Sequence, residues 1–335
     1  VDCAGVYGIA RDLNAAGFGK LKKIENKKIK ESFDTPIKLV NELKRSVCPK
    51  FSLRLIKDVE NLQSSSKIIE RFNSSGIKVI SSLVDITNYL TSDYCRPLHV
   101  FDFDKIKGDV TIRYSKKGEN FFGLDGENYI LEENMIVICD DSGIISLAGI
   151  LGGNSTAVDE NTKNVLIESA YFLPESISSS GRKLNIQSDA RYRFERGVDP
   201  ESVIDGLDIA SNMIVKICGG EVGTIISDSL PVEDSREIKI EKSFFEEILG
   251  LEIPTDFVKN VLEKIGCELK EEDNLLFVKP PSWRSDLNIK EDLTEEVARL
   301  YGYEKIPSKN LTFSDQKVLE KTNDVQKLRN KIKRV

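Results

Sequence analysis

The sequence is poor in several residues from which common sites are built. Its 335 residues include one histidine, one tryptophan and two methionines. The six cysteines are scattered and none forms a C-x-x-C pair, which argues against zinc ribbons and thioredoxin-type redox motifs. We therefore expect free thiols that serve as small core residues in a reducing, cytoplasmic compartment.

The sequence also lacks long apolar runs, and neither sign of charge strongly dominates it. No run of about 18 apolar residues occurs, so we expect no transmembrane helix and no membrane partner. The formal net charge of −7 argues against a surface that binds nucleic acid throughout, although it leaves room for local basic patches. The chain begins without methionine or a secretory pattern, and it ends inside a basic helical pattern. We therefore expect it to be a piece of a longer protein.

The apolar patterns predict an α+β protein of two or three domains, because single cores rarely grow beyond about 250 residues. The first part combines clustered strands in a mixed sheet with outer helices. Predicted helices cover 6–13, 64–72 and 203–217, predicted strands cover 78–80, 110–114 and 165–167, and predicted hairpins lie at Asp125-Gly126 and over 135–147.

A smaller unit follows a change of character near residue 231. Residues 235–307 predict the order strand, helix, helix, strand, strand, helix, which is typical of a winged-helix-like α/β unit. Ser243 and Glu246 predict a capping box at the start of its first helix. The residues after 307 predict a polar linker and the start of a further helix.

Two side chains have the chemistry of a site, although the pattern alone favours a structural role for each. His99 is the only histidine, and its ordinary pKa lets it exchange a proton near neutral pH. Glu168 follows the apolar run 165–167, where a solvent-exposed strand end is the simpler interpretation. The glycine cluster 149–153 is equally compatible with an ordinary turn.

Carboxylates gather near the end of the smaller unit. Asp292, Glu295 and Glu296 fall at i, i+3 and i+4 of a predicted helix, and Asp286 lies just before it. A solvated acidic face is the simplest interpretation from composition. So many close carboxylates repel each other unless a cation or a basic partner neutralises them, and hard oxygen ligands suit Mg²⁺.

Four stretches together resemble one family. In order and spacing they are similar to the bacterial-type phenylalanyl-tRNA synthetase β subunit, and the resemblance covers nearly the whole chain. The stretches are GVYGIARDL at 5–13, VDITNY at 84–89 with RPLHVFD at 96–102, SDARYRFERGVDP at 188–200, and PSWRSD at 281–286 with EEVARLYGY at 295–303.

The resemblance implies an organisation and a set of partners. It implies a tRNA-editing domain at 1–231, a winged-helix-like structural domain at 232–308, and a linker with the start of an inactive synthetase-like domain at 309–335. The α subunit, in an α2β2 assembly, uses ATP and charges tRNA(Phe). This part of phenylalanine–tRNA ligase is then expected to hydrolyse mischarged Tyr-tRNA(Phe), without aminoacylating tRNA itself.

The resemblance also implies roles for particular residues. In the editing pocket, His99 lines the hydrolytic site, Glu168 binds the para-hydroxyl group of tyrosine, Thr87 and Asn88 lie beside the ester, Gly149 and Gly152 keep the pocket wall open, and Ser188 and Ala190 form its edge. The family often has threonine where Ser188 stands, and the hydroxyl group is retained. The implied Mg²⁺ ligands at the α-subunit contact are Asp286, Asp292, Glu295 and Glu296.

Two other functions compete with editing. One is a non-catalytic scaffold that binds the α subunit through a dead editing site, and the presence of His99, Glu168, Gly152 and Thr87 argues against it. The other is a freestanding nucleic-acid-binding protein, which the acidic charge and the lack of a basic helix disfavour. Because no Ser-His-Asp triad or metal-hydrolase cluster is visible, we expect attack by a positioned water molecule.

Overall fold

The computed structural model describes the chain except for residues 23, 25–27, 44–45, 231–235, 309–322 and 334–335. The predicted domain boundary at 231–232 and most of the predicted linker lie outside the described residues. No described helix is long and apolar enough to cross a membrane.

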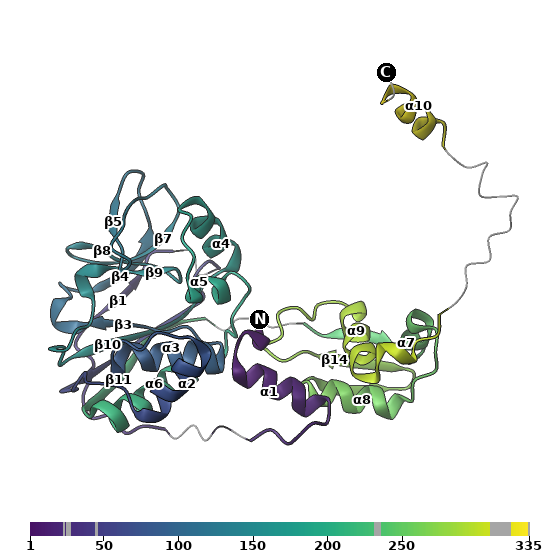
Figure 1. Ribbon diagram of the computed structural model, residues 1–335, viewed down its shortest axis with the longest axis horizontal. Coiled ribbons are helices and arrows are strands. Elements are labelled where there is room, and N and C mark those ends of the chain that lie inside the picture. The colour runs from purple at the N-terminus through teal and green to yellow at the C-terminus, as the bar shows by residue number, and fades with distance from the viewer. Residues whose placement is uncertain (23, 25–27, 44–45, 231–235, 309–322, 334–335) are drawn as a thin grey trace, which may run out of the picture.

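The first part of the chain is built in three layers (Figure 1). The middle layer is an antiparallel sheet in the order β11-β2-β10-β3. One of its faces packs against a mixed sheet in the order β1-β4-β7-β8-β9, in which β1 and β4 pair in parallel and the other described pairs are antiparallel. Helices α2, α3 and α6 cover the other face.

The elements of this part have the following bounds. The middle sheet contains β2 (Lys50–Lys57), β3 (His99–Asp102), β10 (Val165–Tyr171) and β11 (Glu221–Ser229). The mixed sheet contains β1 (Leu39–Asn41), β4 (Val110–Tyr114), β7 (Ile136–Asp140), β8 (Gly143–Leu147) and β9 (Leu151–Gly152), and β5 (Asn120–Phe122) pairs with β6 (Asn128–Ile130). The helices are α1 (Val6–Ala15), α2 (Ser66–Ser75), α3 (Ser82–Tyr94), α4 (Pro174–Lys183), α5 (Asp189–Phe194) and α6 (Ser202–Cys218).

Strand alternation divides the side chains of β10 between two cores. Val165 and Ile167 pack beneath the helices, whereas Leu166 and Ala170 pack between the two sheets. Glu168 has the same parity as Leu166 and Ala170. Its side chain therefore points into the space between the sheets.

The second part has its own core. It contains β12 (Ile238–Glu241), α7 (Lys242–Leu249), α8 (Thr255–Lys264), β13 (Glu268–Glu272), β14 (Leu275–Lys279) and α9 (Lys290–Tyr301), followed by α10 (Asp324–Ile332). The sheet order is β12-β14-β13. Ala15 of α1 is buried in this second core, so the N-terminal helix packs against the C-terminal unit.

The α+β class and the predicted order of elements are confirmed, with local corrections. Residues 78–80 form no strand, because the Ile80 amide donates to the Asp85 carboxylate at the start of α3. Helix α7 begins at Lys242, so Ser243 is not its N-cap residue. The apolar residues Val6, Ile9 and Leu13 of α1 are exposed.

Candidate functional site

Glu168 and His99 are cross-strand neighbours. Strands β10 and β3 are antiparallel, and their register pairs Glu168 directly with His99. Residues that are directly opposite in such a pair have Cβ atoms about 5 Å apart and share one face of the sheet. Two chemically active side chains that are 69 positions apart in the sequence (168 − 99) therefore meet between the two sheets.

The Glu168 residue is buried in the fold. The residue is only 5% exposed and lies in the middle of β10, so the predicted solvent-exposed strand end is wrong. None of the described residues forms a hydrogen bond with its carboxyl group. Burial raises the pKa of Glu168 from 4.5 to about 8. Because buried polar groups are nearly always hydrogen-bonded, this carboxyl group is suited to meet a polar atom of a ligand.

The His99 imidazole is held by packing. It is half-buried, and its ring contacts Phe101 edge-on with 4.5 Å between the ring centroids. Burial lowers the pKa of His99 from 6.5 to about 4, so the ring is neutral at pH 7. A neutral imidazole has one nitrogen that donates and one that accepts a hydrogen bond.

Gly152 brings the backbone of β9 against the imidazole. A Cβ atom at Gly152 would lie 2.4 Å from Cε1 and 2.7 Å from Nε2 of His99. It would also lie 2.8 Å from Cδ1 of Leu124, whose backbone amide donates to the Gly152 carbonyl. Glycine is thus needed for this close approach, and any larger residue would take the space beside the ring.

Gly149 and Ser188 fix the loop that leads to Gly152. Gly149 has φ +67, and an added Cβ atom would meet Phe172, Phe194 and Ile177 at 3.1–3.2 Å, which places it against the core. The Ser188 hydroxyl group caps α5 by accepting from the Arg191 amide. It also donates to the Ile150 carbonyl at 2.6 Å.

The remaining predicted pocket residues lie on helices α5 and α3. Ala190 packs against the core between the sheets. Thr87 and Asn88 belong to α3, which covers the opposite face of the middle sheet. The Thr87 hydroxyl group donates to the Val84 carbonyl within this helix. Among the described hydrogen bonds, none joins Thr87 or Asn88 to His99 or Glu168.

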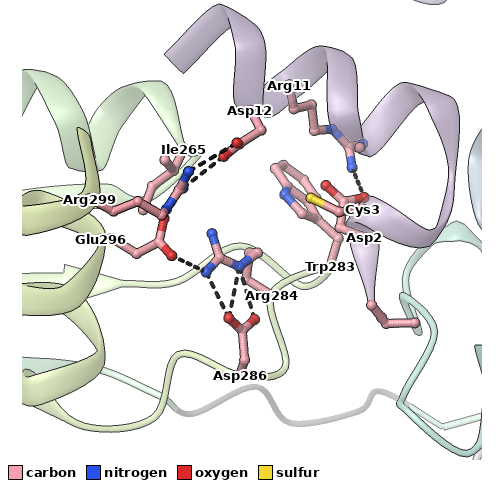
Figure 2. A pocket seen from close by; sticks show the side chains of 12 residues that line it. Asp2, Cys3, Arg11, Asp12, Ile265, Trp283, Arg284, Asp286, Glu296 and Arg299 are labelled. Carbon is pink, nitrogen blue, oxygen red and sulfur yellow. Dashed lines mark hydrogen bonds and ion pairs between the residues drawn. The ribbon is translucent and has the colours of Figure 1, made fainter. Parts of the chain in front are cut away.

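Arginines pair with the carboxylates near α9 (Figure 2). Glu296 is buried and accepts from Arg284 at 2.9 Å and from Arg299 at 2.7 Å. Arg284 also pairs with Asp286 at 2.7 Å, and Arg299 pairs with Asp12 of α1 at the same distance. Burial raises the pKa of Asp286, but the hydrogen bonds from Arg284 outweigh this and leave the pKa below its ordinary value.

The four predicted metal ligands do not form one ligand set. The Asp292 carboxylate accepts from the amides of Asn288 and Ile289 at the start of α9, and Glu295 is exposed. Within the described residues, no group of three or more His, Cys, Asp or Glu side chains could hold a metal ion. The residues therefore do not fit a magnesium site as this chain folds alone, and Mg²⁺ binding stays a prediction.

Comparisons with known proteins identify the family. Residues 47–219 match the B3/4 domain model, and residues 238–303 match the tRNA synthetase B5 domain model. The phenylalanine–tRNA ligase β subunit of Paramagnetospirillum magneticum is 42% identical over 311 residues, which are 92% of this chain and 39% of that protein. The chain belongs to the phenylalanine–tRNA ligase β subunit family. The β subunit of Bradyrhizobium diazoefficiens is also 42% identical, over 91% of this chain and 38% of its own length.

The chain thus spans about two fifths of the curated β subunits it matches. A solved N-terminal fragment of the phenylalanyl-tRNA synthetase β subunit from Pyrococcus horikoshii is 18% identical, over 89% of this chain and 82% of that one. Its TM-score is 0.41.

Three further residues lie around the pair and were missed in the sequence. Leu124 lies beside Gly152, and Phe101 packs on the imidazole. Buried Cys48 belongs to the core between the sheets, and its thiol pKa is raised first by burial and then by the Glu168 charge. Leu124 directly precedes the predicted Asp125-Gly126 turn, so the hairpin pattern could have drawn attention to it. No sequence pattern distinguishes Cys48 from the other cysteines.

Proposed function

We propose that this chain carries an editing site that hydrolyses the ester bond of mischarged Tyr-tRNA(Phe). The observation that carries the proposal is buried Glu168, which lies opposite His99 and whose carboxyl group forms no hydrogen bond with a described residue. Family membership supports aminoacyl esters of tRNA(Phe) as the substrate class, because the relatives are phenylalanine–tRNA ligase β subunits.

Selection of tyrosine follows from the state of Glu168. A carboxyl group whose pKa is raised to about 8 is mainly neutral at pH 7, so it can both donate to and accept from a phenolic hydroxyl group. Phenylalanine would bury the same carboxyl group without a partner. A site built to bond a hydroxyl group can reject an analogue that lacks it by a factor on the order of 10⁴.

His99 and Gly152 provide the reacting end of the site. The neutral imidazole can accept a hydrogen bond from a water molecule and orient it toward the ester carbonyl carbon. The water oxygen bonds to that carbon and the ester C–O bond breaks. The departing ribose oxygen takes the proton that the water loses, which restores the tRNA hydroxyl group as tyrosine is released. Gly152 leaves the space beside the ring open.

The second part of the chain supports a different role. Helix α7 carries one lysine and two glutamates, and β13 carries three glutamates and one lysine. Such elements do not form a basic surface for nucleic acid. We therefore propose a structural, subunit-contact role for this part beside the α subunit, which would use ATP and charge tRNA(Phe).

Deacylation assays test the editing proposal. A complete enzyme carrying this region is mixed with Tyr-tRNA(Phe), and release of tyrosine is followed for the parent and for His99→Ala. The proposal predicts rapid clearance by the parent and a loss on the order of 10²-fold in the variant. Clearance by the parent at the uncatalysed rate would leave the scaffold role as the better account.

A further inference from the structure

Helix α5 presents an aromatic ring that is half open to solvent. Tyr192 is 49% exposed, and the Arg196 guanidinium carbon lies 3.8 Å from the centroid of its ring. The Arg196 side chain is itself 44% exposed, so the pair stands at the surface. An arginine stacked on a tyrosine forms a flat platform with both cationic and aromatic character.

The platform borders a surface hollow of about 450 Å³. Its lining residues are Gln187, Ser188, Asp189, Arg191, Tyr192 and Glu195. Glu195 pairs with both Arg191 and Arg196, and Asp189 pairs with Arg193. The charged groups at the hollow therefore have ion-pair partners. Stacking on Tyr192 is therefore a stronger basis for recognition here than attraction to phosphate groups alone.

A series of contacts links the hollow to the proposed editing site. The Ser188 hydroxyl group donates to the Ile150 carbonyl, two residues before Gly152. Gly152 in turn lies against the His99 ring. Phe194, from the same helix as Tyr192, packs against Gly149 in the same loop. One short loop thus separates the platform from the imidazole.

We propose that Tyr192 and Arg196 form a stacking platform for a base in the single-stranded 3′ end of the RNA whose ester enters the site. This deepens the proposed function and rests on it. Proteins bind single-stranded nucleic acid by stacking bases on exposed aromatic rings and on arginine planes, because every base has a π-face. A base stacked here would hold the RNA end of an ester substrate at this hollow.

Two measurements on the complete enzyme test the platform. In deacylation of Tyr-tRNA(Phe), Tyr192→Ala is expected to raise KM by roughly 10-fold or more with little change in kcat, because base stacking is lost. Tyr192→Phe keeps the ring and is expected to match the parent. In fluorescence anisotropy, Tyr192→Ala is expected to weaken binding of a short single-stranded RNA, but not of a same-length oligomer with abasic sites at its 3′ end.

Two control variants distinguish a failure of the platform from a failure of the editing proposal. Tyr303→Ala removes an equally exposed tyrosine (56%) from the second part of the chain and is expected to change neither readout. His99→Ala is expected to slow hydrolysis on the order of 10²-fold and to leave RNA binding intact. If the parent does not hydrolyse the ester while Tyr192→Ala still weakens RNA binding, the editing proposal fails and the platform stands. If Tyr192→Ala leaves KM and RNA binding unchanged, or alters only subunit assembly, the platform is refuted.

Discussion

Glu168 faces His99 across antiparallel strands, and burial drives their pKa values in opposite directions. The pKa of Glu168 is raised to about 8 and that of His99 is lowered to about 4. Between these values both groups are mainly uncharged. The pair can then exchange hydrogen bonds with an uncharged phenol and with water, without the cost of burying an ion.

The folding stability should depend on pH in a way that reflects the raised pKa of Glu168. The folded protein keeps a proton that the unfolded chain releases between pH 4.5 and about pH 8. The stabilisation is therefore fully present below pH 4.5 and is lost as the pH rises through 8, with a limiting slope of about 1.4 kcal/mol per pH unit.

Glu168→Gln removes this titration and keeps the shape of the side chain. We expect the difference in Tm, variant minus parent, to increase as the pH is raised from 5 to 8.5. The contribution of His99 to stability depends on pH in the opposite direction. Its lowered pKa gives a stabilisation that is present above pH 6.5 and is lost as the pH falls through 4. A Tm difference that stays constant over this range would show that Glu168 is ionised in the folded protein.

Gly152→Ala should impair the site more than the fold. The added Cβ atom meets the ends of the His99 and Leu124 side chains, which can move aside. We expect ester clearance to fall on the order of 10²-fold as the imidazole is displaced, with a stability change below about 1 kcal/mol. Gly19→Ala is the matched control, because its Cβ atom would meet no atom within 4 Å. Equal clearance by both variants would contradict a role for the imidazole position.

Arg96 should be a determinant of stability. It is 1% exposed and donates to the Ala170 carbonyl, the Asp199 carbonyl and the Ser202 hydroxyl group, which ties the end of β10 to α6. Arg96→Ala removes the guanidinium donors from the buried Ala170 carbonyl and from the half-buried groups of Asp199 and Ser202. We expect a loss of about 3 kcal/mol in urea unfolding. Arg71→Ala removes a half-exposed ion pair with Asp93 and should cost less than about 1 kcal/mol. Similar losses in the two variants would contradict this account.

Regular elements could be predicted from the sequence because their signals are local. The helical period of α6 and the turn residues between β7 and β8 determine each element within a short window. Residues 78–80 misled the same reasoning. Their apolar character is typical of a strand, but the Asp85 carboxylate, five residues after Ile80, accepts a hydrogen bond from the Ile80 amide.

The site could be predicted only in part because its contacts are distant in sequence. A short apolar run does not show which strand will pair with it, so Glu168 seemed to end a strand in solvent. The acidic positions of α9 likewise predicted one solvated face. In the fold, Glu296 is buried between Arg284 and Arg299, and only the tertiary structure brings these groups together.

The most direct test compares two esters. Clearance of Tyr-tRNA(Phe) and of Phe-tRNA(Phe) is measured for the complete enzyme and for Glu168→Ala. The account predicts that the parent clears the tyrosyl ester far faster, and that the variant reduces this preference by a factor on the order of 10²–10⁴ because nothing then reads the hydroxyl group. A Glu168→Ala enzyme with the parent's preference would contradict the account, because selection would then reside elsewhere.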